Sequence, residues 1–212
     1  MIRRALPPLA GLFLFLPVLL AGCQSGVWRD LAGEPPDAAP GVTPPAERIE
    51  QLDELAAAAG KRSPEQQQKI TRRLAEEIVD EDDPMIRARI VRTLASYPTA
   101  TGREVLQRAL RDPDHEVRIA ACRAWGRSGT AEAVKLLGRT LQRDADVDVR
   151  LAAARALGET GEESAVEPLG KALHDKDPAM QYRAMQSLAR VTGEDLNTLG
   201  AWRHYIATGR PP

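Results

Sequence analysis

The segment that decides the fold is DVDVRLAAARALG at residues 146–158, because its pattern returns along the chain. It begins with an acidic residue, continues with an apolar residue and an arginine, and ends in a run of small residues, leucine and glycine. Related segments start at Asp114, 32 residues earlier, at Asp83, a further 31 earlier, and at Asp177, 31 later. Such a period is typical of stacked units that cannot bury their apolar faces alone. The sequence therefore predicts an all-α fold, an α-solenoid of stacked antiparallel helical hairpins.

Each unit is predicted to contain two helices. In the first helix, apolar residues recur near i, i+4 or i+5, and i+8, which places them on one helical face. These residues are Ile86/Val117/Val149/Met180, Val91/Cys122/Ala154/Met185 and Leu94/Trp125/Leu157/Leu188. A second apolar stripe, around Leu106, Leu137 and Leu169, predicts the second helix. Small residues stand at Ala95/Gly126/Gly158/Ala189, where we expect the first helix to turn and its partner to approach closely.

The repeat divides the chain into segments. We predict four repeats over 83–206, at approximately 83–111, 112–143, 144–175 and 176–206, followed by a tail at 207–212. Capping helices are expected at 46–82, and the second of them should be the second helix of an incomplete leading repeat. Helix starts are expected where Thr stands three residues before an acid, and where Asp precedes Pro. These positions are Thr101, Thr160, Thr192, Asp83, Asp112 and Asp177.

These residues resemble the HEAT repeats of the short bacterial type that also occurs in phycobilisome lyases. The signature D-x-x-V-R-x-x-A-x-x-A-L-G is matched fully from Asp146, well from Asp114, and more loosely from Asp83 and Asp177. The last unit departs from it, because Gln181 stands where the others have arginine. The resemblance covers roughly residues 64–206. The ending at 188–205 looks like that of lipid-anchored HEAT-repeat proteins of planctomycete-type bacteria.

The N-terminus has the pattern of a secretory signal peptide at 1–22. It contains Arg3 and Arg4, an apolar run over 5–19, and Leu-Ala-Gly directly before Cys23. This ending resembles the lipobox of bacterial lipoproteins, and it predicts a covalent lipid on Cys23 and no other cofactor. The alternative is an uncleaved membrane helix with an incidental cysteine. Residues 5–22 are short for a membrane span and are interrupted by prolines, which favours cleavage.

Residues 23–45 are predicted to be the lipidated N-terminus and a proline-rich, disordered or extended tether. The resemblance then implies a membrane-anchored bacterial lipoprotein that faces the periplasm. The residue after Cys23 is Gln24 rather than aspartate, which by similarity to enterobacterial lipoproteins favours the outer membrane over the inner. Removal of 1–22 and acylation of Cys23 would leave Cys122 as the last free cysteine, so no internal disulfide is expected.

A first polar ladder follows the repeat at the start of each first helix. Its members are Asp83, Asp114, Asp146 and Asp177 with Arg87, Arg118 and Arg150, the acid standing four residues before the arginine. We favour an interpretation as a structural ladder of hydrogen bonds between repeats, because acid and base can satisfy neighbouring turns. A row of anion-binding arginines is the alternative.

A second polar ladder lies on the second helices. It consists of Arg108, Arg139 and Lys171, with Arg111, Gln142 and His174 beside them. The HEAT resemblance implies that second helices line a concave surface, so these residues would form a partner-binding groove. A basic stripe over several units can steer an acidic protein partner, whereas a merely solvated helix face is the alternative.

Enzymatic and nucleic-acid functions receive little support. With 29 Lys and Arg against 30 Asp and Glu, the chain lacks the basic excess of nucleic-acid-binding proteins. No histidine pair has metal-ligand spacing and no glycine-rich phosphate loop occurs, so neither a catalytic nor a metal site is predicted. His115-Glu116 resembles the iron-binding His-Glu pairs of deoxyhypusine hydroxylases, but that family uses several. We predict a monomeric scaffold for protein–protein interactions; the alternative is a HEAT-repeat enzyme or accessory factor, bilin-lyase-like or deoxyhypusine-hydroxylase-like.

Overall fold

The computed structural model describes residues 44–212. The predicted signal peptide, Cys23 and all of the predicted tether up to residue 43 lie outside the described residues. Within residues 44–212 the chain forms ten α-helices and two short 3-10 helices, and no strand. None of these helices combines the length and apolar character that a membrane crossing requires. The predicted all-α fold is confirmed for this part of the chain.

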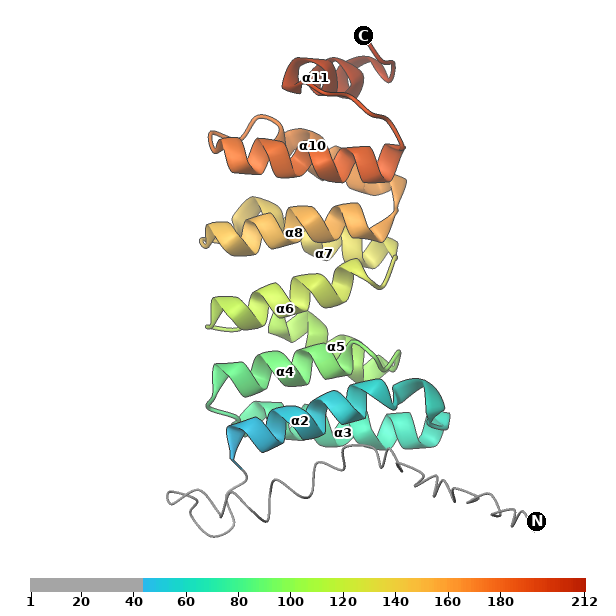
Figure 1. Cartoon of the computed structure of the whole chain (residues 1–212), viewed down its shortest axis with the longest axis vertical. Helices are drawn as coiled ribbons and strands as arrows, with labels where there is room; N and C mark the ends of the chain where they lie inside the picture. The colour runs from blue at the N-terminus through green and yellow to red at the C-terminus, as the bar shows by residue number, and fades with distance from the viewer. Residues whose placement is uncertain (1–43) are drawn as a thin grey trace, which may run out of the picture. The chain divides into compact units, whose positions relative to one another are not determined.

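The helices alternate between two layers. The first-helix layer consists of α2 (Pro45–Ala57), α4 (Pro84–Leu94), α6 (His115–Gly126), α8 (Val147–Thr160) and α10 (Pro178–Thr192). The second-helix layer consists of α3 (Pro64–Asp80), α5 (Ala100–Ala109), α7 (Ala131–Arg143), α9 (Val166–Ala172) and α11 (Leu199–Thr208). Figure 1 shows the first helices stacked in chain order. They pack closely on one another, whereas the second helices contact one another much less.

Small residues allow the close packing of the first-helix layer. A Cβ on Gly126 would lie 3.0 Å from Ala156, and a Cβ on Gly158 would lie only 2.7 Å from the Cβ of Ser187. The helix that approaches each glycine is the first helix of the next hairpin. We expected the partner helix of the same hairpin at this position. The small-residue column therefore sets the spacing between repeats.

The apolar columns form one continuous core. All the predicted residues of the first helices are buried except Met185, which is partly buried against the core. Leu106, Leu137 and Leu169 of the second helices are buried as well. At the end of the stack Trp202 of α11 is 1% exposed, and Tyr205 meets its ring edge-on with centroids 5.7 Å apart.

The first helices begin at aspartates and most second helices begin at threonines. Asp83, Asp114, Asp146 and Asp177 each accept backbone N–H groups of the first turn that they cap. Thr99, Thr130 and Thr198 cap α5, α7 and α11 in the same way.

The helix starts predicted at Thr101, Thr160 and Thr192 are wrong. Thr101 lies inside α5, because Thr99 already caps that helix. Thr160 and Thr192 are the last residues of α8 and α10, and their hydroxyls donate to the carbonyls of Leu157 and Leu188. The glycine that follows each has a positive φ, which ends the helix at that residue. Asp112 is not a cap either, because Asp114 takes that role in α6.

The leading repeat has both of its helices. The helix α2 packs against α4 and α3 packs against α5, so a complete hairpin opens the stack where we expected an incomplete one. Thr93 and Tyr97 of the next hairpin donate hydrogen bonds to the carbonyls of Leu52 and Leu55, at 3.1 and 2.6 Å. These two hydrogen bonds join α2 to the second hairpin and so hold the first hairpin against it.

Candidate functional site

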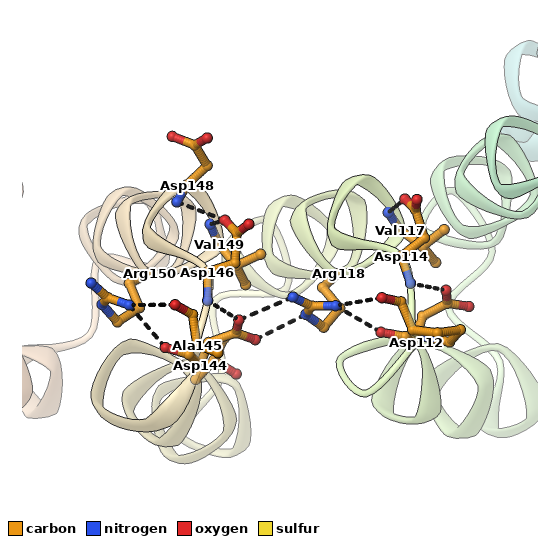
Figure 2. Close-up of polar contacts among 12 residues, drawn as sticks. Asp112, Asp114, Val117, Arg118, Asp144, Ala145, Asp146, Asp148, Val149 and Arg150 are labelled. Atoms are coloured by element: carbon orange, nitrogen blue, oxygen red, sulfur yellow. Dashed lines mark hydrogen bonds and ion pairs between the residues drawn. The ribbon is translucent and has the colours of Figure 1, made fainter.

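A ladder of arginines joins successive loops that lead into the first helices (Figure 2). Arg118 donates from Nε and Nη2 to the two carboxylate oxygens of Asp144, at 3.0 and 3.1 Å. Its Nη1 donates to the carbonyls of Asp112 and Pro113, at 2.9 and 3.1 Å. The arginine therefore fastens the loop before its own helix to the loop that precedes the next hairpin.

Arg87 makes the equivalent contacts one repeat earlier. Its Nε and Nη2 donate to Asp112 at 3.0 and 2.9 Å, and its Nη1 donates to the carbonyls of Glu81 and Asp82. The hydrogen bond to Asp112 is the main cause that raises the pKa of the Arg87 guanidinium. Its side chain and that of Asp112 are only 13% and 12% exposed, so this pair is much less screened by water than a surface ion pair.

The acid of the ladder differs from the one that we predicted. Asp114 and Asp146 stand four residues before the arginines but bond to backbone N–H groups of their own helices. The arginines instead pair with Asp112 and Asp144, each two residues before a cap. Each of these also accepts the N–H of the capping aspartate, at 2.9 and 3.0 Å. The repeated pattern Asp-x-Asp was a signal for this role that the sequence reasoning missed.

The capping aspartate Asp146 contributes a pH dependence of its own. Hydrogen bonds from the N–H groups of Val149 and Asp148 lower the pKa of Asp146. Because the folded-state pKa lies below the unfolded one, the cap stabilises the fold above the unfolded pKa. That stabilisation is lost as the pH falls through the folded pKa.

The ladder changes at its third junction. Arg150 donates from Nη1 to the carbonyls of Asp144 and Ala145, as the other arginines do. Among the described residues no carboxylate accepts a hydrogen bond from it, although Asp175 holds the N–H of Asp177 as Asp112 and Asp144 hold theirs. In the next repeat Gln181 replaces arginine and donates one bond, at 2.7 Å, to the carbonyl of Asp175. The last repeat is therefore joined without the two-pronged carboxylate contact.

The predicted groove residues lie on the second-helix layer or directly after its helices. All six are exposed: Arg108, Arg111, Arg139, Gln142, Lys171 and His174. Lys171 forms an ion pair with Glu167 at 2.6 Å, and this contact also lowers the pKa of Glu167. The guanidinium groups of Arg108, Arg111 and Arg139 have no hydrogen-bond or ion-pair partner within residues 44–212. Among the six predicted groove residues, the unpaired cations therefore lie on α5, on α7 or directly after α5.

A cleft of about 440 Å³ opens between α5 and α7. Its lining residues are Gln107, Leu110, Arg111, Leu136, Arg139, Thr140, Arg143 and Asp144. The structure therefore brings Arg111 and Arg139 together in one cleft, while the other four predicted groove residues lie outside its lining. Sequence reasoning missed Arg143, which stands one helical turn after Arg139 and so shares its face.

The remaining candidate residues do not assemble into a site. His115 Nε2 lies 3.8 Å from Glu116 Oε1, and both side chains are about half exposed. No group of three or more histidine, cysteine or acidic residues capable of holding a metal occurs in the described part of the chain. Cys122 is fully buried, and burial raises its pKa to about 12, as suits a core residue.

Comparison with known proteins identifies the repeat. A family model described as HEAT repeats matches twice, at residues 71–146 and 137–202. Human deoxyhypusine hydroxylase in complex with glycerol is similar in structure, with a TM-score of 0.52 at 22% identity, and 58% of this chain covers 44% of that one. An engineered protein matches with a TM-score of 0.46 and 25% identity, over 71% of this chain and 75% of that one. No curated protein matches the sequence.

This chain spans less than half of the hydroxylase, and at that identity the likeness concerns the fold alone. Because the family model matches most of its length, the chain belongs to the HEAT-repeat proteins.

Proposed function

We propose that this HEAT-repeat protein is a lipid-anchored scaffold of the bacterial cell envelope that binds a protein partner of acidic character. The observation that carries the proposal is the set of exposed, unpaired cations Arg108, Arg111 and Arg139 on adjacent second helices. Exposed single charges add little to stability, so their placement on one face suits recognition better than folding. A basic face attracts acidic partners and raises their association rate.

The anchor rests on the sequence at Cys23 and on the proline-rich segment that follows it. A lipid on this residue would hold the protein at the membrane, and the segment would let the repeats stand away from it. In bacteria fed a clickable fatty acid, the wild-type protein should incorporate the label and the Cys23→Ser variant should not. Equal labelling of the two, or an unlabelled wild-type protein, would remove the anchor from the proposal.

The binding face is tested by charge reversal. Changing Arg108, Arg139 and Lys171 together to glutamate should slow association with an affinity-captured cellular partner on the order of tenfold at low salt. The change should leave the helical circular dichroism unchanged, because glutamate is well tolerated in exposed helix positions. The rate should be measured by surface plasmon resonance at several salt concentrations.

The first-helix layer offers a matched control. Arg123 and Arg127 are exposed, and their guanidinium groups have no partner among the described residues. Arg155 pairs with Glu159 four residues on, as Lys171 pairs with Glu167 four residues before it. Reversing these three charges alters the net charge by the same amount on the other layer. If this control weakens binding as much as the groove variant does, only net charge matters and the proposed face is wrong.

A further inference from the structure

The junction between α5 and α7 differs from the other junctions of the second-helix layer. Between α3 and α5, Gln68 donates to the Thr101 hydroxyl at 3.0 Å, and the hydroxyls of Thr99 and Thr71 are bonded at 3.1 Å. No hydrogen bond or ion pair joins α5 to α7 in the described part of the chain. The space between these two helices is instead the cleft of about 440 Å³.

The later junctions are closed by direct packing. A Cβ placed on Gly138 of α7 would lie 3.4 Å from the Cβ of Pro168 in α9. A Cβ placed on Gly170 of α9 would lie 3.0 Å from a methyl group of Ile206 in α11. The glycines let neighbouring helices approach at these places, whereas α5 and α7 make few direct contacts with each other.

The cleft carries positive charge without compensation from its own walls. Arg111 lies two residues after the end of α5, and Arg139 and Arg143 lie in the last turns of α7. These three guanidinium groups are exposed and have no partner within residues 44–212. The one acid in the lining is Asp144. Its carboxylate already accepts hydrogen bonds from Nε and Nη2 of Arg118 and from the backbone N–H of Asp146. Its charge is therefore used by the ladder and is not available to the three arginines.

The walls also include apolar surface. Leu110 is 8% exposed and Leu136 is partly buried, and both line the cleft together with the Gln107 side chain. A volume of this size lies in the range that accepts a small ligand or a few side chains. The combination of guanidinium groups and leucines matches an acidic side chain with an aliphatic neighbour better than a bare inorganic anion.

We infer that the cleft between α5 and α7 is a receptor for an acidic peptide segment, whose carboxylates bind Arg111, Arg139 and Arg143 while an apolar side chain packs on Leu110 and Leu136. This inference rests on the proposed function and names the element of the partner that is recognised. The chain itself shows the chemistry, because the forks of Arg87 and Arg118 each hold an aspartate carboxylate through two hydrogen bonds. Arginine is the residue best suited to this two-pronged contact.

The probe for the test is a fluorescein-labelled peptide of alternating glutamate and leucine, titrated by fluorescence anisotropy with the full-length protein in detergent. The cleft variant carries Arg111→Gln and Arg143→Gln, two residues that the charge reversal described above does not touch. We expect it to lose about tenfold or more in affinity, as for a lost charged hydrogen-bond pair. A peptide with glutamine in place of glutamate should not bind measurably.

The matched control carries Arg103→Gln and Lys135→Gln. These exposed cations lie on the same two helices but outside the cleft lining, so the net charge falls equally. We expect its affinity to stay within about twofold of the wild-type value, since distant exposed charges act mainly through screened attraction. Replacing Arg111 and Arg143 by lysine keeps the charge but removes the guanidinium groups that donate two hydrogen bonds. The loss of peptide affinity should then lie between those of the control and cleft variants.

Three outcomes would overturn the inference: equal loss in the cleft and control variants, full affinity in the lysine variant and the glutamine variant alike, or no binding of the peptide to the wild-type protein at low salt. The proposed function would survive each of them if the reversal of Arg108, Arg139 and Lys171 still slowed capture of the cellular partner. It would fail by itself if that reversal had no effect while the cleft variants behaved as expected. The melting temperature of each variant should equal that of the wild-type protein, which shows that a loss of affinity reflects binding and not misfolding.

Discussion

The arginines at the start of the first helices and the arginines at the cleft of the second-helix layer have opposite roles. In the first-helix layer Arg87 and Arg118 are largely buried, and each satisfies a carboxylate and two backbone carbonyls. In the second-helix layer Arg111, Arg139 and Arg143 are exposed, and their guanidinium groups have no partner among the described residues. The same side chain thus fastens repeats at the start of the first helices and is available for a ligand at the cleft. Position within the repeat decides which role it has.

The spacing of the two layers explains this division. Small residues bring the first helices together, so polar groups there lose water and must find partners within the protein. The second helices lie farther apart, and water or a binding partner can reach the groups between them. We therefore expect substitutions of buried residues between the first helices to affect stability, and substitutions of exposed cations at the cleft to affect binding.

The largest effect should come from a charge placed between the first helices. Leu157 of α8 has no exposed surface, so Leu157→Asp would bury an unpaired carboxylate and remove apolar packing. We expect a loss of about 3–5 kcal/mol in the free energy of unfolding, measured by urea denaturation. The paired control in the second layer is Arg139→Asp, which should change stability by no more than about 0.5 kcal/mol. Similar losses for both variants would mean that the two layers do not differ as described.

Periodicity alone predicted the apolar part of this fold. Val117, Val149 and Met180 recur at one helical position and are all buried, because a position that must fill the same interface in each repeat keeps its chemical type. Periodicity could not choose between the two acids of each Asp-x-Asp, since both recur at the same interval. Which of them meets the arginine depends on the path of the loop in space.

The cleft between α5 and α7 could not be predicted from the sequence. Arg111 and Arg139 were recognised as cations on the second helices, but the pattern placed them in a uniform stripe with Lys171. The open space depends on the distance between α5 and α7, and α6 and α8 help to fix that distance through their packing on these helices. A local departure from the repeat is what makes this junction different, and a repeat pattern describes only what is shared.

A smaller difference in the free energy of unfolding should distinguish substitutions at Arg118 and Arg150, two arginines of the ladder. Arg118→Ala would leave Asp144, which is 10% exposed, without its charged partner and would free the carbonyls of Asp112 and Pro113. We expect a loss of about 2–3 kcal/mol, because the remaining carboxylate stays largely buried. Arg150→Ala removes only the two bonds to carbonyls and strands no carboxylate, so it should cost about 1 kcal/mol. Thermal and urea denaturation measure both changes.

Cys122 gives a second readout for the same pair of variants. It lies one helical turn after Arg118 in α6, and because burial raises its pKa to about 12, the folded protein should react with thiol reagents only when this region opens. Opening at α6 should become more frequent in the Arg118 variant than in the Arg150 variant, so labelling at a fixed low urea concentration should be faster in the former. Equal stability and equal labelling of the two variants would show that the carboxylate contact adds nothing to the carbonyl bonds. In that case the fastening role of the first layer would rest on its small-residue packing alone.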